Sequence, residues 1–192
     1  MKNKSLVQEP KPILTVNKWK FIVWLFIITI VMLFASQTSA YLVRRAEGNW
    51  TEFQIPMIFW YSTGVLLLSS VFMHFAVRST KKDNFAALKI NISAAFALGM
   101  IFLVMQYIGW QELQAQGIYL KGNPAGSFYY ILTGLHGFHL ITGLVVMLFA
   151  FWASMKMTIH SKNLIRIQVC ATYWHFLDLL WLYLFVFLLF FR

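Results

Sequence analysis

The stretch IQVCATYWHFLDLLWLYLFVFLLFF, residues 167–191, carries a single charged side chain, Asp178, in 25 positions. An α-helix rises about 1.5 Å per residue, so about 20 apolar residues cross the roughly 30 Å hydrocarbon core of a bilayer. The stretch is therefore long enough and apolar enough to form one transmembrane helix. It lacks the alternation of apolar and polar residues that marks a membrane-spanning β-strand.

Four more stretches of this kind lie between flanking charges, at residues 21–43, 53–77, 90–111 and 122–155. Each is long enough to span the bilayer once, and helices satisfy their backbone polar groups internally. The sequence therefore predicts an all-α, polytopic membrane protein, a bundle of five transmembrane helices. We expect a basic tail over residues 1–18 and one transmembrane domain over residues 19–192. The expected helices cover about residues 20–43, 55–77, 87–110, 127–154 and 168–191.

The composition agrees with a membrane protein and argues against a soluble one. Of the 192 residues, 60% are hydrophobic and 11% charged, whereas soluble domains have about 45–50% and about 25%. The net charge of +10 raises the question of a nucleic-acid partner. The basic residues lie in short clusters between apolar runs and form no stripe beside a soluble domain, so we expect no nucleic-acid partner.

The distribution of Lys and Arg predicts the orientation of the chain in the membrane. Twelve of these residues fall in the N-terminal stretch and in the second and fourth connections, and four fall on the opposite side. Under the positive-inside rule, the N-terminus is then cytoplasmic and the C-terminus lies outside.

Ionisable residues at bilayer depth are few, and such residues mark functional sites by default. His136 and His139 lie three residues apart in the fourth expected helix, and His175 and Asp178 are spaced likewise in the fifth. Residues three apart share a helix face. His74 lies near the inner end of the second helix.

These residues admit three interpretations. A bis-histidine haem site needs one imidazole from each of two facing helices, for which His139 and His175 are the candidates. A di-metal carboxylate site needs several buried carboxylates, and Asp178 alone is available. A structural network needs only that His136, His139, His175 and Asp178 hydrogen-bond across the bundle, and the chemistry alone favours this last interpretation.

Four motifs resemble subunit III of the haem-copper oxidases. They are GSFYYILTGLHGFHLITGLVVML (126–148), YWHFLDLLWLYLF (173–185), LLLSSVFMHFAV (66–77) and LGMIFLVMQYIGW (98–110). Together they cover most of the chain in the family's order. The chain is similar to a short, five-helix bacterial form that lacks two helices of the seven-helix version. Two positions depart from the family pattern, because Ile30 and Gly109 stand where the family commonly has glutamates.

The resemblance implies a non-catalytic subunit of a proton-translocating cytochrome c oxidase of the aerobic respiratory chain. The implied location is the bacterial cytoplasmic (inner) membrane, which the chain crosses several times. Haem and copper then belong to partner subunits, and this chain has no catalytic, metal or cofactor-binding residues. The implied partners are oxidase subunit I, by direct packing, subunit II, membrane lipids and a larger respiratory supercomplex. The implied roles are to stabilise subunit I and to support proton uptake and sustained turnover.

Several alternatives remain open at this stage. A third subunit of a quinol oxidase or of a nitric oxide reductase fits the same motifs, and a haem carrier belongs to a different class. A phospholipid is the one candidate ligand of this chain. Residues expected to contact lipid or another subunit are His74, Gln106, Trp110, Trp174 and Trp181.

Overall fold

The computed structural model describes residues 17–155 and 164–191, which form five long helices and contain no strand. The helices are α1 (Lys18–Ala46), α2 (Ile58–Lys81), α3 (Phe85–Ala115), α4 (Pro124–Met155) and α5 (Ile165–Phe191). All five are long and apolar enough to cross a membrane. The predicted all-α, five-helix membrane fold is confirmed. Most of the expected basic tail, residues 1–16, lies outside the described residues, as do Lys156 and Lys162.

Each helix extends past its expected bounds at one or both ends, and α2 alone begins late, three residues after position 55. Pro56 precedes α2, and the residue before a proline is disfavoured in helical conformation. Asparagine side chains cap two helices: Asn17 accepts the Trp19 N–H at 3.1 Å, and Asn84 accepts the Ala87 N–H at 3.1 Å. These caps satisfy backbone donors that the first turn leaves free. The helices therefore begin in the polar segments that border each apolar run.

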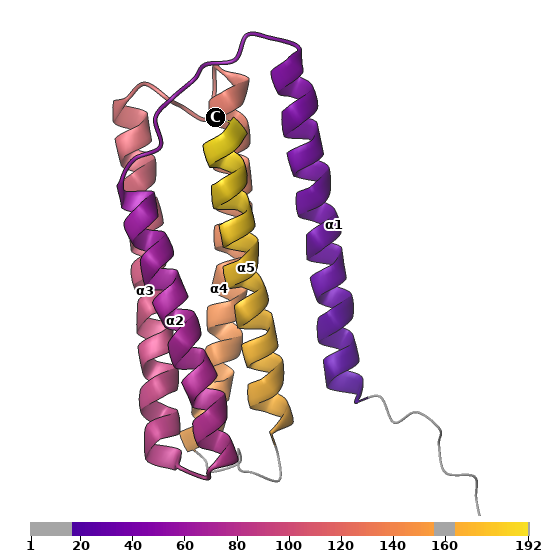
Figure 1. Ribbon diagram of the computed structural model, residues 1–192, viewed down its shortest axis with the longest axis vertical. Coiled ribbons are helices and arrows are strands. Elements are labelled where there is room, and N and C mark those ends of the chain that lie inside the picture. The colour runs from indigo at the N-terminus through magenta and orange to yellow at the C-terminus, as the bar shows by residue number, and fades with distance from the viewer. Residues whose placement is uncertain (1–16, 156–163, 192) are drawn as a thin grey trace, which may run out of the picture.

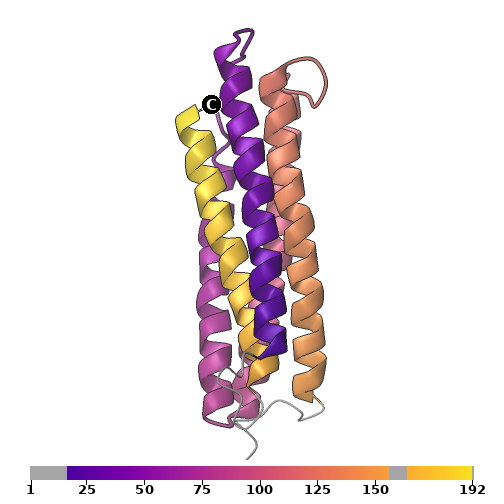
Figure 2. The same cartoon turned by 90° about the vertical axis from the view of Figure 1, so that its right-hand side faces the viewer.

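The five helices stand nearly parallel in an elongated bundle (Figure 1). Helices α2 and α3 form one side, α4 and α5 fill the centre, and α1 lies over α4 and α5 (Figure 2). Among the helices that the structure describes, α1 packs only against α4 and α5. Two hydrogen bonds tie its later half to α5: Tyr41 donates to the Phe191 carbonyl and Tyr183 donates to the Thr38 hydroxyl, each at 3.0 Å. The outer helix is thus attached mainly through α5.

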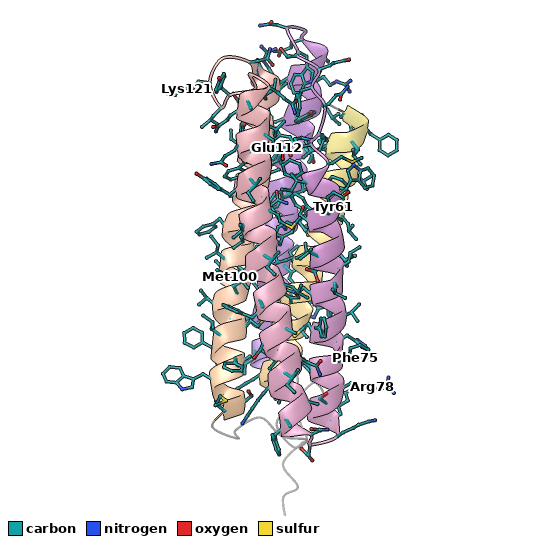
Figure 3. All side chains as sticks on the ribbon, turned by 90° about the vertical axis from the view of Figure 1, so that its left-hand side faces the viewer. Tyr61, Phe75, Arg78, Met100, Glu112 and Lys121 are labelled. Carbon is teal, nitrogen blue, oxygen red and sulfur yellow. The ribbon has the colours of Figure 1, made fainter. Side chains whose placement is uncertain are left out.

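Apolar side chains cover the outside of the bundle on every helix. Tyr61, Phe75 and Met100 are examples, with 67%, 46% and 45% of their surface exposed, and Figure 3 shows them along α2 and α3. The same view places Arg78 at one end of the bundle and Lys121 at the other (Figure 3). An apolar belt between charged ends is the surface expected of a protein surrounded by lipid.

Candidate functional site

Tryptophan N–H groups on α5 are paired with hydroxyls on α2. Trp181 Nε1 donates to Thr63 Oγ1 at 3.0 Å and Trp174 Nε1 donates to Ser69 Oγ at 3.2 Å. The two helices run in opposite directions, so the bonds follow each other along the interface (Figure 1). Both indoles are only 1% exposed. The expectation that Trp174 and Trp181 contact lipid or another subunit is therefore wrong, because the bundle itself buries them.

The polar residues of α3 also bond within the bundle. Gln106 Nε2 donates to Ser62 Oγ at 3.1 Å, and Trp110 Nε1 donates to Thr133 Oγ1 at 3.2 Å. Gln106 is 6% exposed, so its expected contact with lipid or a partner is also wrong. Trp110 is half-buried, whereas His74 is exposed and remains available for an outside contact.

The two histidines of α4 do not pair as the sequence suggests. His136 is fully buried and both of its ring nitrogens lack a partner in the described residues. Its ring lies against Trp181 and Phe102, with centroids 5.1 Å and 6.2 Å away. His139 Nδ1 bonds to the Leu135 carbonyl of its own helix at 2.8 Å. These two side chains contact their neighbours by ring packing and by a bond to their own helix, and their ring nitrogens form no hydrogen bond to another helix in the described residues.

The polar pair of α5 faces α2. His175 Nδ1 lies 2.7 Å from Ser70 Oγ and 3.9 Å from Asp178 Oδ2. Asp178 is 3% exposed, and neither carboxylate oxygen has an aligned hydrogen bond within residues 17–155 and 164–191; the Ser70 hydroxyl is close to it. No hydrogen bond in that part of the chain joins His136 or His139 to His175 or Asp178. The predicted four-residue network is thus corrected to two separate groups.

The geometry also bears on the haem alternative. The His139 ring packs against Phe34 of α1, with centroids 5.7 Å apart, whereas His175 bonds to Ser70 of α2. Their contacts are with different helices, an arrangement that does not favour one haem between them. The described residues contain no cluster of three or more His, Cys, Asp or Glu able to hold a metal ion.

The two positions that lack the family's glutamates are closely packed. Ile30 is 2% exposed. A Cβ atom added to Gly109 would lie 2.5 Å from Cζ of Phe59, closer than two carbon atoms approach without repulsion. The interior of this chain has no room for a carboxylate at position 109 without movement of Phe59.

A cavity of about 390 Å³ opens at the end of the bundle where α1 begins. It lies between the first turns of α1, the last turns of α2 and the first turns of α5, and we call it the basal cavity. Its polar and ionisable lining residues are Lys20, His74, Gln168, Thr172 and His175. His175 therefore stands between this cavity and the buried carboxylate of Asp178.

The hydroxyl residues that receive these contacts have no place among the site residues expected from the sequence. Four hydroxyl residues of α2 each bond to a side chain of α3 or α5: Ser62, Thr63, Ser69 and Ser70. Their spacing is the available signal, because residues seven apart in a helix lie on the same face. Single hydroxyls are common in membrane helices, so the signal identifies a face without identifying its partners.

The comparisons with known proteins decide the family. Residues 12–192 match the family model described as cytochrome c oxidase subunit III. The chain belongs to the cytochrome c oxidase subunit III family. It is 29% identical over 167 residues to cytochrome c oxidase subunit 3 of Bacillus sp. (strain PS3), covering 84% of this chain and 80% of the relative.

Two further relatives show the range of the family. Cytochrome c oxidase subunit 3 of Thermostichus vulcanus is 28% identical over 171 residues, 85% of this chain and 82% of the relative. Cytochrome bo(3) ubiquinol oxidase subunit 3 of Pseudomonas aeruginosa is 29% identical over 167 residues, 84% of this chain and 79% of the relative. This subunit III is thus a component of a haem-copper terminal oxidase, with a quinol oxidase as the alternative.

Proposed function

We propose that this subunit III is a non-catalytic, stabilising subunit of a bacterial cytochrome c oxidase. It packs beside subunit I, accompanies subunit II, and supports proton uptake and sustained turnover. Haem and copper are held by the partner subunits, and this chain contributes packing surface and bound phospholipid. The chain lies in the inner membrane with its N-terminus in the cytoplasm.

The observation that carries this proposal is that buried N–H donors of the chain form hydrogen bonds within its own helix bundle. The indole N–H groups of Trp174 and Trp181 and the amide N–H of Gln106 bond to hydroxyls inside the bundle. The apolar belt outside is available to lipid or to another membrane subunit. Interhelical hydrogen bonds of this kind contribute about 0.6 kcal/mol each on average. An arrangement that uses these polar groups inside the bundle supports a structural role for this chain.

The test is purification of the complex in mild detergent from membranes that contain this chain. Reduced-minus-oxidised spectra are recorded before the large subunits are stripped away and again on the chain left behind. We expect haem to leave with the large subunits and the isolated chain to be colourless. Haem that stays on the isolated chain would overturn the proposal and make its histidines ligands.

The quinol-oxidase relative favours a second candidate, a third subunit of a quinol oxidase. The same purified complex distinguishes the two, because it oxidises either reduced cytochrome c or a quinol. Oxidation of cytochrome c supports the first assignment. Oxidation of quinol alone replaces it with the second.

A further inference from the structure

His175 forms part of the wall between the basal cavity and the protein interior. Its Nδ1 faces inward, 2.7 Å from Ser70 Oγ and 3.9 Å from Asp178 Oδ2, while its ring also lines the cavity. Since the two nitrogens of an imidazole lie on different sides of the ring, Nε2 remains for the cavity. An imidazole with one nitrogen on each side of a wall can pass a proton through it.

The Asp178 carboxylate lies on the interior side of His175 and has few polar contacts. Asp178 is 3% exposed and its oxygens have no aligned hydrogen bond in the described residues. An ionised carboxylate without such bonds is costly to keep in an apolar interior. Binding a proton removes that cost, so the residue gains from a route to a proton source.

The charged groups around the cavity come from all three of its helices. Lys20 belongs to α1 and His74 to α2, and His74 is close enough to interact electrostatically with His175. A second hollow next to the cavity shares His74 and adds Arg78, Lys81 and Lys82 of α2. These basic side chains border the cavity on the α1 and α2 sides, and the His175 imidazole faces them from α5.

The route ends at Asp178 on the side away from the cavity. One turn further along α5 lies Trp181, 1% exposed, whose N–H is already donated to Thr63. An indole offers a donor and no acceptor, so it cannot pass the proton on. The access of this carboxylate is therefore from the basal end of the bundle.

We propose that Asp178 is a proton-exchange site, loaded and unloaded from the basal cavity through His175 and Ser70. In the starting state Asp178 is ionised and the neutral His175 donates a hydrogen bond from its Nδ1–H to Ser70 Oγ. A proton from cavity water binds Nε2, the Nδ1 proton moves to Ser70, and the Ser70 hydroxyl proton moves to the Asp178 carboxylate. The result is a neutral carboxylic acid, a neutral His175 protonated on Nε2, and one hydroxide ion that leaves the cavity for bulk water.

Release follows the same three steps in reverse and restores the starting tautomer of His175. The site thus stores one proton without moving it across the membrane. The inference rests on the proposed function for its purpose, since a proton store on the cytoplasmic side would serve proton uptake by the oxidase. The exchange itself is a property of this chain and can be measured separately.

The experiment uses infrared spectroscopy of the purified oxidase complex during a change from H₂O to D₂O. The C=O band of protonated Asp178 is identified by its loss in Asp178→Asn, and its isotope shift gives the exchange rate. We expect His175→Ala to slow this exchange about 100-fold, the effect of removing a positioned proton-transfer group. Added imidazole enters the basal cavity and restores the rate, which a purely structural role of His175 does not predict.

Two serines on the same turn provide a matched pair. Ser70→Ala removes the hydroxyl that passes the proton and slows the exchange. Ser69→Ala also removes a buried hydroxyl, which bonds to the Ala95 carbonyl and to Trp174. We expect Ser69→Ala to leave the exchange rate unchanged. Equal rates in wild type, His175→Ala and Ser70→Ala would overturn the proposal, as would the lack of any band that Asp178→Asn removes.

The same samples separate this inference from the proposed function. Retention of the chain with the haem-containing subunits is measured by its amount in each purified complex. Slowed exchange in a variant that stays assembled supports the relay. If the wild-type chain does not copurify with an oxidase, the proposed function fails, and the exchange rates measured on the isolated chain still decide the relay.

Discussion

Gly99→Ala tests whether the close contact between the backbone of α3 and the Trp174 indole of α5 holds the bundle together. A Cβ atom at position 99 would lie 2.8 Å from Cη2 and 3.1 Å from Cζ2 of Trp174, and 2.9 Å from Cδ2 of Leu144. The opposite edge of the same indole lies against Gly143 of α4, where an added Cβ would be 3.2–3.3 Å away. Trp174 therefore has glycine backbone on both sides and cannot retreat freely from either.

The magnitude follows from these distances. An ordinary contact to a Cβ atom begins at 3.4 Å, so the indole must move about 0.6 Å, which would weaken its N–H bond to Ser69. Inserting a methyl group into a packed core costs typically about 1–3 kcal/mol. We expect Gly99→Ala to lower the free energy of unfolding by about 2 kcal/mol, roughly a 30-fold change in the ratio of folded to unfolded protein.

The assay is denaturation of the detergent-solubilised chain by increasing mole fractions of SDS, followed by tryptophan fluorescence. Gly137→Ala is the matched control, because an added Cβ at position 137 meets nothing within 4 Å. The control keeps or slightly raises the stability, since alanine favours helix by about 1 kcal/mol over glycine. Gly99→Ala and Gly137→Ala of equal stability would refute the reasoning.

Three further predictions use the same denaturation assay. In a double-mutant cycle of Trp181→Phe and Thr63→Val, the coupling energy is about 0.6–1.7 kcal/mol, and zero coupling would show that the 3.0 Å bond adds no stability. His136→Phe leaves the stability unchanged or raises it by about 1 kcal/mol, because both ring nitrogens lack partners in the described residues and an apolar replacement removes that penalty; a large loss would reveal a partner. Gly109→Glu destabilises by at least about 3 kcal/mol, through contact with Phe59 and a buried charge, and wild-type stability would show that Phe59 yields easily.

The fold could be predicted almost completely from the sequence, because the bilayer fixes the length of each apolar run. Five runs between charges predict five helices, and residues 17–155 and 164–191 form five helices. The ends of the helices are harder to predict, since α3 continues to Ala115, beyond the charged Glu112. A charge marks the edge of the hydrocarbon region, whereas the helix continues into the interface as long as its backbone bonds are satisfied.

The candidate site was predicted less well because helical periodicity gives a face without giving its neighbour. His136 and His139 share a spacing with His175 and Asp178, but His136 packs on aromatic rings and His139 bonds to its own helix. Which helix lies opposite a given face depends on how the bundle assembles. Ser70 illustrates the difficulty, since its bond to His175 joins residues 105 positions apart.

The α2–α5 interface contains two kinds of contact, hydrogen bonds of tryptophans that hold the helices together and one histidine contact that can exchange protons. Trp181 and Trp174 bond to Thr63 and Ser69, and none of these four side chains ionises near neutral pH. The contact between His175 and Ser70 lies at the level of the Trp174–Ser69 bond, but it contains an imidazole and borders a cavity. The first two contacts can therefore hold the helices together while the third changes its protonation. We therefore expect substitutions of Trp174 or Trp181 to lower the stability without changing the rate of proton exchange. We expect Ser70→Ala to slow proton exchange without changing the stability.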